Sequence, residues 1–200
     1  MRGARELWPC ESGGKAMTIA HPNRFDLATL SECERHRFLL SRTIDDSEYL
    51  ESGRIGQSIG WIMFNPSTAD GLTDDATIRK VIGFSQRAGF SDLTVANLFS
   101  LRATNPKYVA ANLDDACPST NLEAIDYVLS ACSVVVCAWG ALAAPRWVQE
   151  RVRDVVRRAE VAGHSGKLHI IDLSKDGHPV HPLMQAYAKG IQPWFTRAKL

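Results

Sequence analysis

Hydrogen-bonding side chains are concentrated in residues 65–75. This stretch holds seven of them in eleven residues: Asn65, Ser67, Thr68, Asp70, Thr73, Asp74 and Asp75. Amides, hydroxyls and carboxylates at this density can hold a water molecule or contact the polar edge of a ligand. A turn and a helix cap would explain some of these residues without any site, but not all seven. The stretch is therefore the first candidate site.

A strand and a helix are expected to position this stretch. Residues 59–64 form a short apolar run typical of a strand buried on both faces, and Pro66 ends it. Proline keeps the preceding residue extended, so the Asn65 amide should project just beyond the carboxyl end of the strand. Asp75 can cap a helix over residues 75–88. Open α/β sheets bind ligands at this end of their strands.

Three further apolar runs, at 93–98, 133–139 and 168–173, predict strands of the same sheet. Each ends in, or is followed by, residues that could contact a ligand: Asn97 and Arg102, then Trp139, then His178 and His181. Parallel strands joined by right-handed crossovers bring their following loops to one edge, so these side chains should meet the Asn65 loop there. Arg102 could instead make an ordinary surface salt bridge, and Trp139 could lie in the core.

Two more helices and one more strand complete the predicted elements. Thr120 and Glu123 form a capping box that should open a helix, and Pro145 should open another that ends at Gly163. Residues 106–118 are expected to be irregular. Residues 33–44 predict an edge strand. Its charged side chains, Arg35, Arg37 and Arg42, could form an anion-binding row, but we expect them to face solvent.

These elements predict an α/β fold, a three-layer sandwich with a central, mainly parallel sheet and helices on both faces. The 200 residues, 45% hydrophobic and 22% charged, suit one domain over residues 21–200 preceded by a flexible N-terminal arm over residues 1–20. The net charge of +1 gives no overall indication of a nucleic acid, a membrane surface or an acidic partner, although a local basic face would not show in this sum. No apolar stretch reaches the roughly 18 residues of a membrane span, so we expect a cytoplasmic protein without membrane contact.

Metal and cofactor chemistry is not indicated. The five cysteines are an odd number without a C-x-x-C pair, which favours reduced thiols, with Cys132 and Cys137 in the core. His178 and His181 lack the cysteine or carboxylate partners of a zinc site. We therefore expect no metal and no cofactor.

Several motifs, in order, resemble an uncharacterised family known as domain of unknown function 1643. They are Asn65-Pro-Ser-Thr-Ala-Asp70, Asp75-x-Thr77-x-Arg79, Asn97-Leu-Phe-x-x-Arg-Ala-Thr104, Ala138-Trp-Gly140 and Gly177-His-Pro-x-His-Pro-Leu183. The resemblance runs from about residue 35 to 185. More distantly, the layout is similar to the uracil-DNA glycosylase superfamily, particularly its mismatch-specific branch. Ser67-Thr68 departs from the glycine-containing turn of that superfamily.

The distant resemblance implies a uracil-DNA-glycosylase-like fold and hydrolysis of a base-sugar N-glycosidic bond in nucleic acid or a nucleotide. It matches Asn65 to the residue that positions the attacking water and His181 to the closing loop. With Asp70 or Asp75 helping to hold the water, the expected catalytic residues are Asn65, Asp70 and His181. The expected substrate-binding residues are Phe64, Ser67, Thr68, Asn97, Arg102, Trp139 and His178. The alternative is a non-catalytic module that binds a nucleotide or nucleic acid on the same fold.

Overall fold

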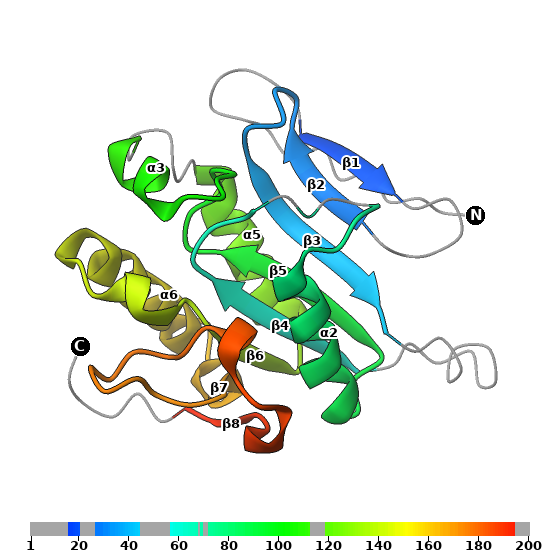
Figure 1. Ribbon diagram of the computed structural model, residues 1–200, viewed down its shortest axis with the longest axis vertical. Coiled ribbons are helices and arrows are strands. Elements are labelled where there is room, and N and C mark those ends of the chain that lie inside the picture. Colours follow the sequence, from blue (N-terminus) through cyan, green and yellow to red (C-terminus); the bar gives the residue numbers. More distant parts are fainter. Residues whose placement is uncertain are drawn as a thin grey trace.

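The computed structural model describes residues 16–20, 27–44, 57–67, 69, 72–112 and 119–194 (Figure 1). Its centre is an eight-stranded sheet in the order β1-β2-β3-β5-β4-β6-β7-β8. The four predicted strands are neighbours in this sheet and run parallel: β4 (Ser58–Met63), β5 (Asp92–Asn97), β6 (Val134–Cys137) and β7 (Leu168–Ile170). The prediction that these segments share one sheet is confirmed.

Antiparallel strands extend the parallel centre on both sides. Beyond β5 lie β3 (Arg37–Thr43), β2 (Leu27–Ser31) and β1 (Ala16–Ala20), and beyond β7 lies the short β8 (Gln192–Pro193). The sheet is therefore mixed, and the prediction of a mainly parallel sheet holds only for its centre. The predicted edge strand is β3, and it is internal because β2 and β1 pair outside it. The edge strand β1 falls within the segment expected to be a flexible arm.

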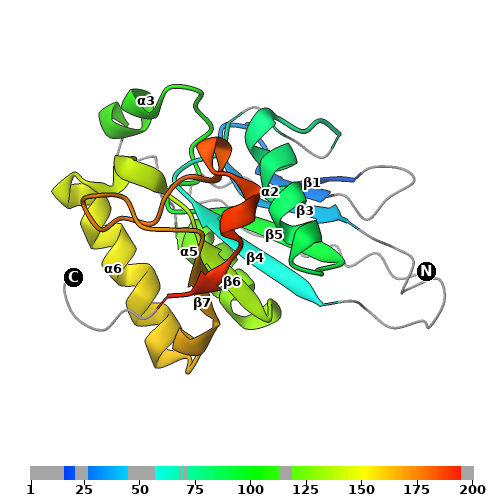
Figure 2. The ribbon, with the colours of Figure 1, turned by 60° about the horizontal axis from the view of Figure 1, so that its bottom comes forward.

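Helices cover both faces of the sheet, which confirms the expected layering (Figures 1 and 2). One face carries α2 (Ala76–Arg87), and the other carries α5 (Ser119–Ala131) and α6 (Arg146–Val161). Asp75 caps α2 as predicted, since its side chain accepts a hydrogen bond of 2.8 Å from the Ile78 N–H. Pro145 occupies the cap position of α6.

Two local predictions were wrong. Thr120 lies inside α5 and is buried, so it does not cap that helix. Residues 106–111, expected to be irregular, form α3 (Pro106–Ala111), while residues 113–118 lie outside the described ranges. The signal for α3 was present: Pro106 follows Asn105, whose side chain accepts from the Lys107 N–H at 3.0 Å.

Each face of the sheet has its own apolar core. On the α2 face, Trp61, Val95 and Phe84 are buried, and on the α5/α6 face, Ile62, Val128 and Val155 are buried. Cys132 and Cys137 are buried thiols, as expected, and burial raises the pKa of each. Within the described ranges, no helix has the length and apolar character required to cross a membrane.

The C-terminal segment returns over the end of α2 through the short helices η3 (Pro182–Met184) and η4 (Tyr187–Lys189) (Figure 2). The Tyr187 ring packs against Phe84 with centroids 4.9 Å apart. The cations of Lys80 and Arg87 each lie 3.9 Å from the Tyr187 ring centroid. These contacts fasten the closing segment to α2.

Candidate functional site

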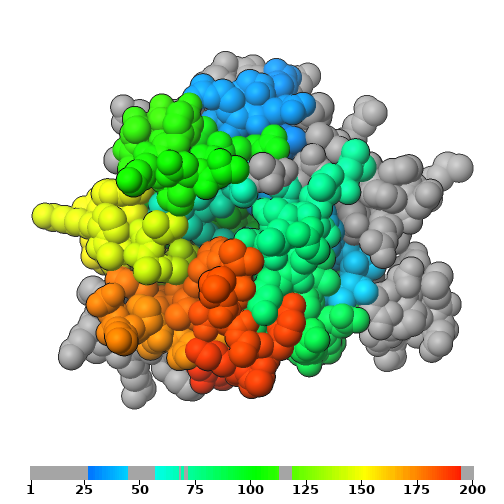
Figure 3. Space-filling view, viewed as in Figure 1, coloured from blue at the N-terminus to red at the C-terminus, as the bar shows by residue number. Residues whose placement is uncertain are grey.

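The sheet has a topological switch point between β4 and β6. The chain leaves β4 toward α2 on one face, and it leaves β6 through η1 (Gly140–Ala143) toward α6 on the other face. In open α/β sheets the diverging loops at such a point leave a crevice at the carboxyl ends of the strands. Figure 3 shows a hollow on this side of the molecule, between α3, the start of α6, η3 and α2. The Asn65 loop and Gly140 follow the two strands concerned.

Asn65 is held in one orientation by backbone carbonyls. Its Nδ2 donates to the carbonyl oxygen of Ala103 at 2.7 Å and to that of Pro66 at 2.9 Å. The Ala103 N–H donates in turn to the Pro66 carbonyl at 2.9 Å, so the loops after β4 and β5 lie side by side. The Asn65 Oδ1 has no hydrogen-bond donor among the described residues. This oxygen is the acceptor that a bound water would need.

Asn97, at the end of β5, is fully buried on the α2 face beside Met63 of β4. Within the described part of the chain, neither its Oδ1 nor its Nδ2 has a hydrogen-bond partner. Its backbone carbonyl accepts a hydrogen bond of 3.0 Å from the Asn121 Nδ2. Burying an unpaired amide costs about 1–3 kcal/mol, so this side chain requires an explanation beyond folding.

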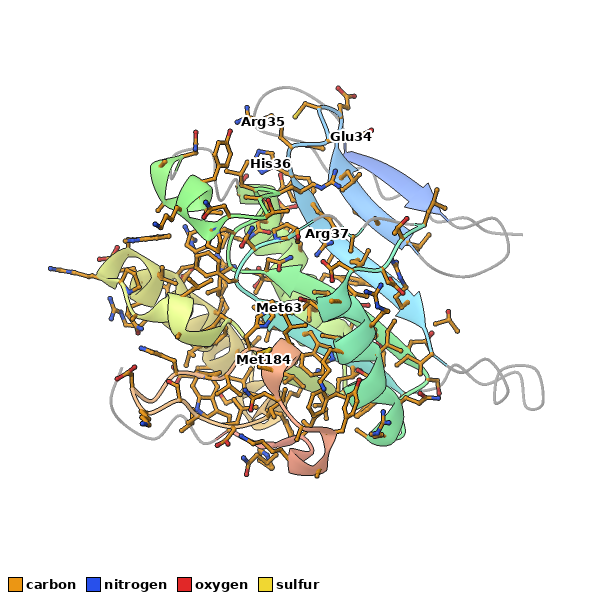
Figure 4. The ribbon with its side chains drawn as sticks, viewed as in Figure 1. Glu34, Arg35, His36, Arg37, Met63 and Met184 are labelled. Carbon is orange, nitrogen blue, oxygen red and sulfur yellow. The ribbon has the colours of Figure 1, made fainter. Side chains whose placement is uncertain are left out.

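The loop after β4 closes over this part of the α2 face. Ala69 is buried in the same cluster as Met63, and its carbonyl accepts a hydrogen bond of 2.7 Å from the Arg37 Nη1. Arg37 of β3 is only 1% exposed, and Figure 4 shows it beneath this region. The register between β2 and β3 shifts at Thr29 and Leu30, and Leu30 pairs with Arg37, so a β-bulge lies next to Arg37.

The prediction that all three arginines of this strand face solvent was wrong. Arg35 is exposed, but Arg37 and Arg42 are buried. Arg42 Nε lies 2.8 Å from the Asp74 Oδ1, and its Nη1 donates to the Ser41 carbonyl at 2.9 Å. Buried guanidinium groups are tolerated when carboxylates and carbonyls satisfy them, and a single sequence does not reveal such partners.

His181 caps η3 and packs against the glycine that follows β6. Its Nδ1 accepts a hydrogen bond of 3.3 Å from the Leu183 N–H. Gly140 has φ of +75°, and a Cβ placed there would lie 3.0 Å from the His181 Cβ, which favours glycine on both grounds. Burial lowers the pKa of His181, and the Asp75 charge partly opposes this shift. A neutral imidazole with Nδ1 as acceptor carries its proton on Nε2.

His178 contacts different neighbours. The backbone N–H of His178 donates to the Ser174 Oγ at 3.1 Å, in a turn where Gly177 has φ of +79°. Its Nδ1 lies 3.4 Å from the Gln149 Nε2 on α6. The two histidines of the His-Pro repeat therefore have separate surroundings. Within the described ranges, no three His, Cys, Asp or Glu side chains gather as metal ligands.

Two aromatic residues predicted to stack on a base lie in the core instead. Trp139 is fully buried, with its ring centroid 5.7 Å from that of Trp194. Phe64 packs against Phe99 at 5.3 Å and Trp147 at 6.2 Å. Both point to the α5/α6 face, where they fill the space under α6, so in this arrangement neither ring is exposed to stack on a base.

Ser67 and Arg102 line a shared pocket of about 330 Å³ beside the Asn65 loop. The other lining residues are Glu34, Arg35, Leu101, Ala103, Thr104 and Tyr108. A larger cavity of about 670 Å³ lies between α5 and α6, but no predicted site residue lines it. We place the candidate site at the smaller pocket because it adjoins the carboxyl ends of β4 and β5.

The structure thus joins some predicted site residues and separates others. Asn65, Ser67 and Arg102 adjoin one another, and His181 lies against Gly140 at the switch point. Thr68 and Asp70 lie outside the described residues. Glu34 and Tyr108 also line the pocket, although neither was predicted from the sequence. Glu34 lies at the pocket because His36, two residues further along the chain, pairs with Leu101. Such a long-range pairing leaves no pattern in the local sequence.

A family model described as "Protein of unknown function (DUF1643)" matches residues 37–183, which is more than half of the chain. No curated protein and no solved structure matches the chain.

Proposed function

We propose, for a chain that belongs to the DUF1643 family, that the carboxyl edge of the sheet binds a nucleic acid or nucleotide and hydrolyses its base-sugar N-glycosidic bond. The observation that carries this proposal is the buried Asn97 amide, whose two polar atoms have no hydrogen-bond partner among the described residues. An amide offers an acceptor and donors side by side, which is the complement needed to read the edge of a base. A bound base would satisfy both atoms.

The distant similarity to the uracil-DNA glycosylase superfamily supports the same proposal. The strands that lead to Asn65-Pro66, Asn97-Leu98 and Gly140 are adjacent and parallel. Asn97 has no exposed surface in this arrangement, so a base could reach its amide only after the side chains that cover it shift.

Cleavage of the bond would use three further residues, Asn65, Asp70 and His181. The departing base gains negative charge while the sugar gains positive charge, so the site needs a held water and a donor aimed at the base. Asn65 would hold the water through Oδ1, since its Nδ2 is bound to Ala103. His181 would donate from Nε2–H to the base, since its Nδ1 is occupied by the Leu183 N–H. Asp70 is proposed as the second residue that holds the water.

A second candidate function is a binding module that performs no chemistry. The hydrogen bonds from Asn65 to the carbonyls of Ala103 and Pro66 favour it, because joining two loops is a sufficient role for this side chain. In this case the Asn97 amide would still bind a base, but no bond would break.

The deciding experiment measures base release from a panel of modified and mismatched bases in single-stranded DNA, duplex DNA, RNA and mononucleotides. Abasic sites or free base are the readout. We expect release from at least one substrate by the wild-type protein and none by Asn97→Leu, with Arg153→Gln, an exposed change on α6, behaving as wild type. Binding of a substrate without release would favour the binding module, and neither binding nor release would contradict both candidates.

A further inference from the structure

We infer that the 330 Å³ pocket beside the Asn65 loop binds a phosphate of the substrate, so that the ligand is a nucleotide or a nucleic-acid strand rather than a free nucleoside. We call it the phosphate pocket and define it by its polar lining residues: Glu34, Arg35, Ser67, Arg102, Thr104 and Tyr108. The inference rests on the proposed function only for the nucleoside part of the ligand. The phosphate part is argued from the pocket itself.

Three chain segments build the pocket and are joined by backbone hydrogen bonds. The Arg102 N–H donates to the Arg35 carbonyl at 2.8 Å, which ties the loop after β5 to the turn between β2 and β3. The Ala103 N–H donates to the Pro66 carbonyl at 2.9 Å, which ties the same loop to the loop after β4. The volume lies at the lower end of the range for small-molecule sites, roughly 300–1,000 Å³.

The polar groups of the pocket suit an anion. Arg102 uses one hydrogen bond, from Nη1 to the Glu34 carbonyl at 3.1 Å, and no carboxylate of the described residues pairs with it. Its other guanidinium donors remain for a ligand, and the exposed Arg35 adds a second cation. The hydroxyls of Ser67 and Thr104 supply further donors. A guanidinium with nearby hydroxyls is a common arrangement for phosphate recognition.

Glu34 shapes the pocket through an uncommon backbone conformation. Its φ is 55°, and it is the one non-glycine residue with positive φ in the described part of the chain. The conformation is held by its N–H, which donates to the Ser31 carbonyl at 2.8 Å, and by its carbonyl, which accepts from Arg102. Such strain persists where the surroundings fix it, often at ligand sites. Figure 4 shows Glu34 and Arg35 together at this turn.

The pocket adjoins the proposed reaction site. Ala103 lines the pocket, and its carbonyl is the group that accepts from the Asn65 Nδ2. Arg102 is therefore the chain neighbour of the residue that holds the Asn65 side chain, which is the side chain proposed to hold the water. Tyr108 is 49% exposed on the pocket wall, where its ring can stack on a sugar or a neighbouring base.

The test compares binding of the common deoxynucleoside 5′-monophosphates with binding of the matching nucleosides, by calorimetry on the full chain. We expect the wild-type protein to prefer the phosphorylated form. Arg102→Gln should weaken mononucleotide binding about tenfold and leave nucleoside binding unchanged. Arg153→Gln removes the same charge from an exposed position on α6 and should change neither. Glu34→Gln removes the opposing carboxylate and should strengthen mononucleotide binding a few-fold.

An oligothymidylate of about ten nucleotides identifies the source of the phosphate. Tighter binding of the oligomer than of thymidine 5′-monophosphate, with a salt slope that falls by about 0.7 in Arg102→Gln, would indicate a phosphodiester. Tighter binding of the mononucleotide would indicate a terminal phosphate. If Arg102→Gln fails to fold, Arg102→Lys serves in its place, with a smaller loss, because lysine keeps the charge without the planar fork.

The inference is wrong if no phosphorylated probe binds, if nucleosides and mononucleotides bind equally, or if Arg102→Gln weakens both alike. This result is separable from the test of hydrolysis. Phosphate-dependent binding without base release would contradict the hydrolase and leave the pocket assigned. Base release at an unchanged rate in Arg102→Gln, without preference for phosphorylated ligands, would support the hydrolase and contradict the phosphate pocket.

Discussion

The side-chain amide of Asn65 donates a hydrogen bond of 2.7 Å to the backbone carbonyl of Ala103. This contact joins the loop after β4 to the loop after β5, and it leaves the Asn65 Oδ1 without a donor among the described residues. One side chain therefore fixes the geometry of the site and presents an acceptor to it. Experiments on Asn65 must separate these two effects.

Asn65→Ala should abolish base release and lower the free energy of unfolding by about 1–2 kcal/mol, because the Ala103 carbonyl loses its side-chain donor. Denaturant unfolding and an abasic-site assay measure the two effects. Ser133→Ala is the control, since it removes a 3.1 Å hydrogen bond to the Ser58 carbonyl at the opposite end of β4. The control should retain full activity. A folded Asn65→Ala protein that releases base at the wild-type rate would rule out water positioning.

Asn97→Leu should stabilise the free protein by about 1 kcal/mol or more, because two buried polar atoms without a partner among the described residues become methyl groups on a side chain of the same branched shape. Asn121→Leu is the matched comparison and should destabilise, since the Asn121 Nδ2 donates to the carbonyls of Asn97 and Leu98. Denaturant midpoints at constant slope give both values. A destabilised Asn97→Leu would mean that folding already uses the Asn97 amide, which removes the argument for base recognition.

The centre of the fold could be predicted because its signals are local. Residues 59–64 and 93–98 are apolar runs long enough for buried strands, and Asp75 and Pro145 mark helix starts. The antiparallel side of the sheet could not be predicted in the same way. Burial of Arg37 and Arg42 depends on Ala69 and Asp74, which are more than thirty residues away in the sequence. Sequence reasoning placed these arginines in solvent by their usual preference.

The candidate site could be predicted only in part. Asn65, Ser67 and Arg102 lie on neighbouring loops because parallel strands deliver their loops to one edge. The same rule does not say which face a side chain at the strand end will point to. Phe64 and Trp139 fall on the α5/α6 face and are buried there. Tyr108 enters the pocket from α3, and no pattern in the sequence marks it.

Asp74→Ala should lower the free energy of unfolding by about 2–4 kcal/mol, because it removes the carboxylate that lies 2.8 Å from the Nε of Arg42, a side chain only 3% exposed. Arg157→Ala provides the contrast. Its side chain is 71% exposed beside Asp154, and removal should change stability by less than about 0.5 kcal/mol. Thermal and denaturant unfolding of both variants test the difference. Equal losses of stability in the two variants would mean that burial of the Arg42 guanidinium adds little to the strength of its ion pair with Asp74.

The lowered pKa of His181 predicts that the protein loses stability in mild acid. The unfolded imidazole titrates near its ordinary value of 6.5, and the folded one titrates below it because burial disfavours the charged form. Between these two values the unfolded state binds more protons, so the free energy of unfolding falls as pH drops below about 6.5, until the folded pKa is passed.

His181→Asn keeps an acceptor for the Leu183 N–H and removes the titration, so its stability should depend less on pH over this range. Asp75→Asn keeps a helix cap and removes the charge that opposes the shift, so it should lower the His181 pKa further. Titration of the His181 ring by NMR, with denaturant unfolding from about pH 8 to about pH 5, measures both effects. A His181 pKa at or above 6.5 would contradict the neutral Nε2–H donor proposed for the departing base.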